Sequence, residues 1–459
     1  MYYQPTLINK IKLDLIKISS PVIKKFYFLT PFLTLESLLV YYFFLVFTFG
    51  RSFTGLNIIG LRIGELMIAT ALFLFLYYVI FKTKKIDTLI GKKANLILKL
   101  MLLAFILNNL VYNGLASFTN PQVFRSSSFI WSLGFIFVLI FVNKVRIFDS
   151  NLFLIGILFC LPLVYILTSV YFPSILESFF NQYSDKFRLL KGSDLFMVYA
   201  IYCTFFMVRI RNNNFLYVFT FLISGILIPL IVFSSRGAAI GTIVVLFFTI
   251  LKNKNAFLRN KLLFLISIAG FLICLTLSSI YLDWSKIDFE EINAEYAIKS
   301  VETTLITKRY PAERQMPVFY FFEGRLMSGD GNLNWRFQIW QDVIFDLINT
   351  NKIIFGYGYE DSIPAMEEIS RQGLDGENIH VHNYFINILA RGGILQLTLF
   401  LIFYYLLLLK FKKDKENNHI VAFIVAVLIV SFFDSSMESV RFPFLFFSVL
   451  SHKLHNLSK

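Results

Sequence analysis

Residues 214–251, NFLYVFTFLISGILIPLIVFSSRGAAIGTIVVLFFTIL, decide the fold class of this chain. Two apolar runs fill the stretch, and Arg236, in the turn between them, is its only charged residue. An α-helix needs about 20 predominantly apolar residues to cross the hydrocarbon core of a bilayer. The stretch therefore predicts two transmembrane helices, joined by a turn so short that the Arg236 guanidinium lies at the membrane surface.

Apolar runs of this kind recur along the whole chain. Of its 459 residues, 57% are hydrophobic and only 16% are charged, whereas soluble domains carry about 25% charged residues. We expect about twelve spans. They lie near 31–50, 57–81, 96–115, 127–143, 151–172, 194–209, 214–233, 237–251, 261–282, 383–409, 419–433 and 442–452. The sequence predicts an all-α polytopic membrane protein without a cleavable signal peptide.

The formal net charge of +14 follows the order of the spans. Every second turn is rich in lysine, as at 82–93, 252–261 and 410–415, and the turns between carry single arginines. This is the positive-inside pattern, so both termini are expected in the cytoplasm. Topology thus accounts for the charge, and no nucleic-acid partner is expected.

The same pattern divides the chain into four parts. Residues 1–30 are expected as a cytoplasmic segment, 31–283 as spans one to nine, 284–381 as a large loop outside the cytoplasm and 382–452 as spans ten to twelve. Within the loop, an apolar stripe from Asn334 to Ile348 predicts a helix that packs on the membrane domain or on lipid headgroups.

Two smaller features have modest implications. Residues 172–194 mix aromatic and charged side chains, which fits either an amphipathic segment on the membrane surface or a solvated connection. The three cysteines lie inside predicted spans and fit neither a disulfide framework nor a metal site, so we expect small buried hydrophobes.

Two histidines stand where the large loop re-enters the membrane. His380 and His382 are the only histidines outside the cytoplasm by this topology, and Asn383 follows directly. Histidine transfers protons near neutral pH, so either ring is a candidate general base. The alternative is a surface histidine at a loop end.

Two arginines are candidate anion ligands. Arg236 stands between Ser235 and Gly237, at the start of a predicted helix. The free N–H groups of the first helical turn and the guanidinium can together bind phosphate. Alternatively, Arg236 anchors the span in the lipid headgroups. Arg336 shares a helical face with Trp340, which fits a ligand-binding arginine stacked on an indole or a purely structural cation–π pair.

Several catalytic signatures are missing from the sequence. It has no Asp-x-Asp pair, no Walker loop, no Gly-x-Ser-x-Gly and no His-Glu-x-x-His, and the first outward turn, 50–54, lacks an acidic residue. An enzyme with this sequence is expected to work without a metal or other cofactor.

The motifs, taken in order, resemble those of the O-antigen ligase and O-antigen polymerase superfamily of bacterial membranes. They are Ser235-Arg236-Gly237 at a span start, Arg336-x-x-x-Trp340 in the long loop, the Phe355-Gly-Tyr-Gly358 turn, His382-Asn383-x-x-Ile386 and Gly392-Gly-Ile394. The matching stretch runs from about 214 to 400, and the N-terminal half agrees only in hydropathy. The family usually has leucine at the position of Ile386.

The resemblance implies a GT-C-like fold and an inverting glycosyltransferase in the bacterial cytoplasmic (inner) membrane. The donor would be a glycan on polyprenyl (undecaprenyl) diphosphate, and the acceptor lipid A-core for a ligase or a lipid-linked glycan for a polymerase. Carried over by position, Arg236 and Arg336 would hold the diphosphate, and His382 would activate the acceptor hydroxyl, with Ser235, Gly237, Trp340, Asn383 and His380 in supporting places.

The sequence also fits other functions. Ligase and polymerase share these features, and the second histidine, His380, leaves the identity of the base open. A polysaccharide flippase would have ionisable residues within its spans and duplicated halves, whereas here Glu65 is the clearest mid-span charge. A non-catalytic partner of a glycan assembly complex would keep the topology without needing the arginines and histidine together.

Overall fold

The computed structural model of the protein describes residues 35–58, 60–142, 146–185, 187, 190–206, 209–259, 261–282, 319–322, 324–367, 380–414 and 419–457. Two expectations lie outside these residues: the cytoplasmic segment at 1–30, and the first part of the large loop, up to residue 318.

The described part of the chain is predominantly helical. Its longer helices are α3 (Leu35–Thr54), α4 (Ile63–Leu76), α6 (Lys92–Tyr112), α10 (Asn151–Tyr165), α11 (Ser174–Tyr183), α12 (Gly192–Phe206), α13 (Asn214–Ser234), α14 (Arg236–Arg259), α15 (Lys261–Tyr281), α17 (Gly331–Asn349), α18 (Tyr384–Lys412), α19 (His419–Phe433) and α20 (Arg441–Leu457). Shorter ones are α5 (Thr83–Leu89), α7 (Pro121–Ser126), α8 (Ser128–Trp131), α9 (Val138–Phe141) and the turns η2 (Tyr77–Phe81), η3 (Leu115–Thr119), η4 (Ser132–Phe137), η5 (Arg146–Asp149), η6 (Ile166–Val170), η7 (Arg209–Asn212), η8 (Pro364–Met366) and η10 (Ser436–Glu438).

Two antiparallel hairpins, which the sequence reading did not predict, complete the described elements. The strand β1 (Asn57–Ile58) pairs with β2 (Leu61–Arg62), and β3 (Tyr320–Phe322) pairs with β4 (Arg325–Met327). They are short, so the fold class remains helical.

Within the described residues, eight helices are long and apolar enough to cross a membrane, and three shorter apolar helices accompany them. Each of the twelve expected runs overlaps helical structure, although the run at 127–143 is broken into α8, η4 and α9. The integral membrane class is therefore confirmed. The number twelve and the GT-C-like fold stay predictions.

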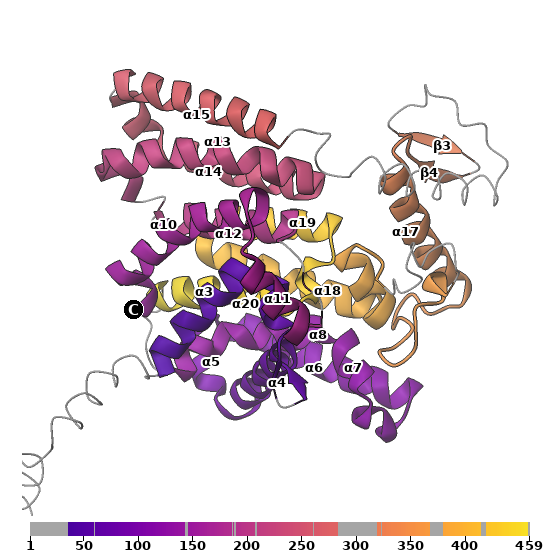
Figure 1. The fold of residues 1–459 in the computed structure, drawn as a ribbon. Coiled ribbons are helices and arrows are strands. Elements are labelled where there is room, and N and C mark those ends of the chain that lie inside the picture. Colours follow the sequence, from indigo (N-terminus) through magenta and orange to yellow (C-terminus); the bar gives the residue numbers. More distant parts are fainter. Residues whose placement is uncertain are drawn as a thin grey trace, which may run out of the picture.

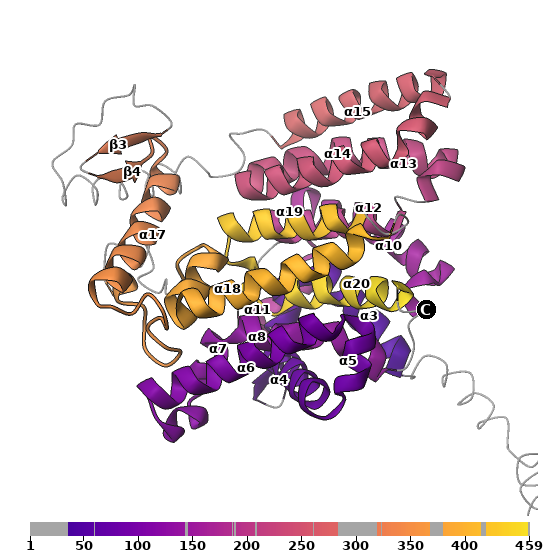
Figure 2. The ribbon, with the colours of Figure 1, turned by 180° about the vertical axis from the view of Figure 1, so that it is seen from behind.

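The helices α13, α14, α15, α18, α19 and α20 lie roughly along one direction (Figures 1 and 2). Figures 1 and 2 show α13, α14 and α15 together at one flank, α18, α19 and α20 in the middle, and α4, α5 and α6 at the other flank. The helix α17 stands at one end of the bundle and runs across it, whereas the C-terminus lies at the opposite end (Figure 1).

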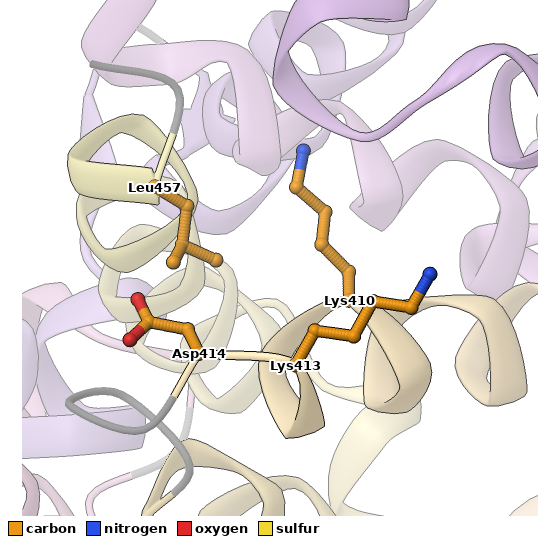
Figure 3. A pocket seen from close by; sticks show the side chains of 4 residues that line it. All are labelled: Lys410, Lys413, Asp414 and Leu457. Carbon is orange, nitrogen blue, oxygen red and sulfur yellow. The ribbon is translucent and has the colours of Figure 1, made fainter.

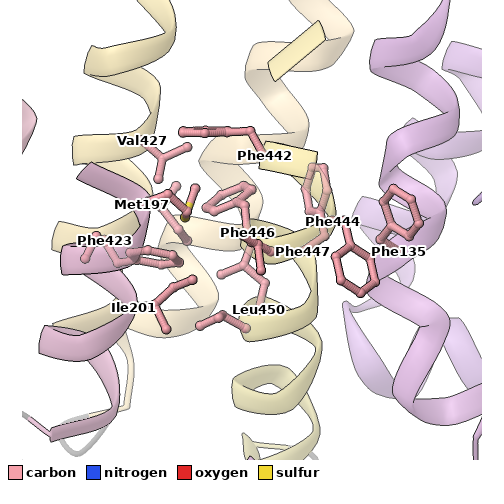
Figure 4. Close-up of a cluster of buried hydrophobic side chains, with 14 of the residues drawn as sticks. Phe135, Met197, Ile201, Phe423, Val427, Phe442, Phe444, Phe446, Phe447 and Leu450 are labelled. Carbon is pink, nitrogen blue, oxygen red and sulfur yellow. The ribbon is translucent and has the colours of Figure 1, made fainter. Parts of the chain in front are cut away.

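Aromatic side chains fill the middle of the bundle as well as its periphery. Figure 4 shows Phe423 of α19 and Phe446 of α20 in one cluster, with ring centroids 5.4 Å apart. At its edge, Phe135 of η4 meets Phe444 edge-on at 5.3 Å. Such pairs contribute about 0.5–1.5 kcal/mol beyond the burial of their area. Some of the 55 phenylalanines of the chain therefore contribute to helix packing inside the bundle.

The helix predicted at 334–348 is confirmed as α17. Its stripe residues Ile339, Val343 and Leu347 are fully buried and pack with Tyr357 and with Leu389 at the start of α18. Of the two surfaces that the sequence left open for this helix, the membrane domain is the one it covers. Burying each of these side chains stabilises the contact by about 1.5–3 kcal/mol, so α17 is firmly seated.

The helix α18 is interrupted one third of the way along. Gly393 has φ 67° and ψ −173°, which no helix contains. The turn at 352–358 fits into this break: Tyr357 N–H donates to the Ala390 carbonyl at 2.7 Å, and Ile394 N–H donates to the Ile353 carbonyl at 2.9 Å. The glycine-rich turn and Gly392-Gly-Ile394, separate motifs in the sequence, are therefore two halves of one contact.

Replacing Gly393 by alanine is expected to loosen this contact. The backbone conformation is nearly exclusive to glycine and costs another residue about 1–3 kcal/mol, and a Cβ would lie 2.1 Å from the Ile354 carbonyl oxygen. Gly114 is a matched control, because it has φ 70° and ψ −170° but no atom within 4 Å of its Cβ position. We expect a larger loss of thermal stability for Gly393→Ala than for Gly114→Ala. Equal losses would show that the collision has no effect.

Candidate active site

The turn between α13 and α14 is held by small residues. Ser235 caps α14 because its Oγ accepts the N–H of Ala238 at 3.3 Å. At Gly237, a Cβ would lie 2.4 Å from the Cβ of Phe433, the last residue of α19. Only glycine lets the start of α14 approach the end of α19 this closely, and the approach brings Arg236 to the α17 end of the bundle.

Arg236 forms an ion pair with Asp330, which precedes α17. The other oxygen of Asp330 caps α17 by accepting the N–H of Leu333 at 2.9 Å. Burial opposes the charged carboxylate, but the Leu333 N–H and the Arg236 guanidinium outweigh it and lower the pKa of Asp330. The Arg236 side chain is 83% exposed, so its guanidinium remains open to an anion.

Arg336 lies on α17 and points at the end of α19. Its Nη1 donates to the Phe433 carbonyl, and its buried Nε has no partner in the described part of the chain. Burial lowers the pKa of Arg336, and the negative charges of Asp434 and Asp330 counter that effect. The guanidinium therefore stays charged, with donor capacity left over.

Trp340 and Arg336 have separate partners. The Trp340 Nε1 donates to the Val381 carbonyl at 2.7 Å, and its ring meets Phe432 at 5.5 Å. Trp340 thus fixes the backbone just before His382, a positioning contact that differs from the expected stacking with Arg336.

His382 lies beside α17 in a left-handed backbone conformation with φ 52°. Its ring centroid is 5.2 Å from that of Trp335. The next residue, Asn383, is fully buried, and its Oδ1 accepts the N–H groups of Phe385 and Ile386 at 2.9 and 3.1 Å to cap α18. Burial, followed by the positive charge of Arg336, lowers the pKa of His382 to about 3. The imidazole is therefore neutral near pH 7 and able to accept a proton.

His380 has a different environment. Its Nδ1 lies 2.8 Å from Oε2 of Glu438 on η10. This hydrogen bond raises the pKa of His380, although burial works against it. The Nδ1 of His380 is already engaged by Glu438, whereas no carboxylate is hydrogen-bonded to His382 in the described residues, so this contact makes His382 the better candidate base.

Three carboxylates of the site escaped the sequence reading: Asp330, Asp434 and Glu438. Asp434 accepts a hydrogen bond from Ser436 Oγ at 2.7 Å. Its negative charge acts to raise the pKa of both Arg336 and His382. A usable signal was present, because Asp330 precedes an apolar stripe as a helix cap does. The other two are acidic residues in a short turn between predicted spans.

Together these contacts bring the predicted residues to one place. Asp330 lies within the field of both Arg236 and Arg336, and Arg336 acts on His382. Two cations and a neutral imidazole at the rim of an apolar bundle can bind a diphosphate and deprotonate a hydroxyl.

Other features of the described chain lie outside this cluster. A hollow of about 480 Å³ lined by Lys410, Lys413, Asp414 and Leu457 (Figure 3) is at the far end of α18 from His382. In the described ranges, no three His, Cys, Asp or Glu residues are grouped as a metal site. Cys160, Cys203 and Cys274 are free thiols.

The comparison with protein families matches residues 221–401 to the model described as O-Antigen ligase. This range agrees with the stretch of about 214–400 expected from the motifs, and it contains Arg236, Arg336 and His382. The search of curated proteins found no match.

Proposed function

We propose, from the match of residues 221–401 to the O-antigen ligase family model, that the protein transfers a glycan from polyprenyl diphosphate to an acceptor hydroxyl outside the cytoplasm. The observation that supports this most directly is the convergence of Arg236, Arg336 and a neutral His382 at one end of the bundle. The acceptor is lipid A-core in a ligase and a second lipid-linked glycan in a polymerase.

In this mechanism the two arginines hold the leaving group. The C1–O bond of the donor sugar breaks toward the diphosphate, and cations placed where negative charge develops stabilise the transition state. Arg236 is exposed enough to reach a diphosphate at the membrane surface, and Arg336 has an unused Nε–H. The acceptor oxygen attacks from the opposite face, which inverts the anomeric centre.

His382 takes the proton of the attacking hydroxyl. Its low pKa in the free protein is due to burial and to the charge of Arg336. A diphosphate on Arg336 offsets that charge, so donor binding raises the basicity of His382 when a base is required.

The proposed location is the bacterial inner membrane, with both termini in the cytoplasm and α17 on the other side. The opposite placement of α17 and the C-terminus in the bundle supports this topology (Figure 1), as does the lysine-rich pattern of alternate turns.

The test uses protein reconstituted in liposomes and purified lipid-linked repeats, with and without lipid A-core. Growth of lipid-linked chains identifies a polymerase, and capture by lipid A-core identifies a ligase. Activity is expected to persist in EDTA, because the proposed mechanism uses only side chains. Absence of transfer to either acceptor contradicts the proposal, and a loss in EDTA that added metal restores contradicts its metal independence.

Asp330→Asn is expected to strengthen donor binding. The carboxylate competes with the diphosphate for Arg236, and asparagine caps a helix as well as aspartate does. An exposed ion pair is worth up to about 1 kcal/mol, so the donor KM should fall up to about fivefold. Asp342→Asn is the control, since Asp342 lies on the same helix and pairs with Arg325 at 2.6 Å. An increased donor KM in Asp330→Asn alone would mean that the carboxylate positions Arg236 instead.

The pH dependence should differ between the free and donor-bound protein. The ratio kcat/KM for the donor reports the free enzyme, where the pKa of His382 is about 3. It should therefore stay level on acidification from pH 8 to 5. In contrast, kcat reports the bound enzyme and should fall at a higher pH, because the diphosphate raises the pKa of the base. Identical profiles would contradict this coupling.

A further inference from the structure

A buried carboxylate beside His380 has one unoccupied oxygen. Glu438 lies in η10, between α19 and α20, and its side chain is 9% exposed. Its Oε2 is 2.8 Å from His380 Nδ1, whereas its Oε1 is buried and has no hydrogen bond in the described part of the chain. A buried acceptor left unpaired is costly, so such an atom points to a donor on a ligand.

An unoccupied donor is present on the same segment. Asn383 is 0% exposed, and its Oδ1 is committed to the two N–H groups that it caps. This fixes the orientation of the amide, so the remaining atom is the Nδ2 donor, which is buried and has no acceptor among the described residues. His382 therefore lies between two residues with an unpaired polar atom nearby. On one side, His380 is hydrogen-bonded to Glu438, whose Oε1 has no partner among the described residues. On the other side, Asn383 has an Nδ2 donor without an acceptor there.

We propose that Glu438 and Asn383 form a subsite for a neutral, hydroxyl-bearing sugar of the acceptor, next to the hydroxyl that His382 activates. A sugar hydroxyl is both donor and acceptor, so it complements the carboxylate Oε1 and the amide Nδ2. This inference rests on the proposed function. Glu438 accepts a hydrogen bond and takes no proton: the attacking hydroxyl gives its proton to His382, its oxygen bonds to C1, and polyprenyl diphosphate leaves.

Two basic side chains lie near the Glu438 carboxylate. Arg391 on α18 lies within its field, and the Nδ1 of His380 is 2.8 Å from its Oε2. A carboxylate that is bound through one oxygen and unpaired at the other can accept a further hydrogen bond. Glu438 could also have a purely structural role, as a latch that joins the end of the large loop at His380 to η10. Such a latch would need only the hydrogen bond between Glu438 and His380.

The test separates the subsite from the latch by kinetics in the reconstituted protein. Glu438→Gln removes the charged acceptor at constant size, and His380→Gln removes the latch while leaving the carboxylate. A hydrogen bond to a charged group corresponds to about ten- to a hundredfold in affinity. We expect the acceptor KM to rise by that factor in Glu438→Gln and by less than about threefold in His380→Gln, with the donor KM nearly constant in both.

Each outcome decides the inference. Equal increases in acceptor KM in Glu438→Gln and His380→Gln would mean that Glu438 has only a structural role. A wild-type acceptor KM in Glu438→Gln would rule out the subsite and leave the proposed function intact. No transfer by the wild-type protein removes both. Glu438→Asp keeps the charge at a shorter reach and serves if the glutamine variant fails to accumulate; its acceptor KM should rise while its donor KM does not.

Discussion

His382→Asn is expected to lower the rate of glycan transfer about a hundred- to ten-thousandfold, the usual contribution of a general base. Asparagine is the informative replacement, because it tolerates the left-handed conformation at φ 52° that His382 adopts. Alanine would add backbone strain and obscure the chemical loss. The measurement is the single-turnover rate of glycan transfer in liposomes, with donor and acceptor saturating.

The control for this experiment is His380→Asn. His380 is paired with Glu438 and has a raised pKa, so its loss should leave most of the transfer rate. Both variants should insert and bind donor as the wild type does, since Arg236 is held by Asp330 and Arg336 by the Phe433 carbonyl, and both substitutions leave these contacts in place. If the two variants lose activity in the reverse order, the base is His380.

Hydropathy was sufficient to predict the class and the placement of most helices. A bilayer leaves few ways to satisfy a spanning backbone, so apolar length alone is a strong signal. The stripe Trp335-Ile339-Val343-Leu347 likewise predicted α17, because amphipathic periodicity depends on local sequence. The lysine pattern also predicts Arg236, Arg336 and His382 on the same side of the membrane. Their common location at one end of the bundle could therefore be anticipated.

The partners of these residues could not be predicted in the same way. Asp330 is 94 positions from Arg236, and Phe433 is 97 positions from Arg336, so both contacts depend on how α17 docks. The break at Gly393 also depends on tertiary structure, since the 352–358 turn supplies the hydrogen bonds that the interrupted helix lacks. For Trp340, the helical spacing to Arg336 suggested stacking, and only the fold reveals the Val381 carbonyl as its acceptor.

Arg336→Gln is the second replacement with a large expected effect. Removing one preorganised donor at a site of developing charge typically lowers kcat about a hundred- to a thousandfold. Lysine should restore only part of the rate, because it lacks the planar fork that binds a diphosphate through two N–H groups. Arg325→Gln is the matched control: Arg325 binds Asp342 at 2.6 Å and Gln338 at 2.9 Å, contacts that join β4 to α17.

A second readout separates chemistry from structure for Arg336. Because its charge is among the causes that lower the pKa of His382, Arg336→Gln should raise that pKa, and the acid limb of kcat/KM should move to higher pH. Arg325→Gln should leave the limb in place, since the main charges acting on His382 are those of Arg336 and Asp434. A slow Arg336→Gln variant with an unshifted limb would mean that Arg336 only anchors α17 to the Phe433 carbonyl. A shifted limb with a slow rate would place the arginine and the imidazole in one electrostatic unit, which the proposed mechanism requires.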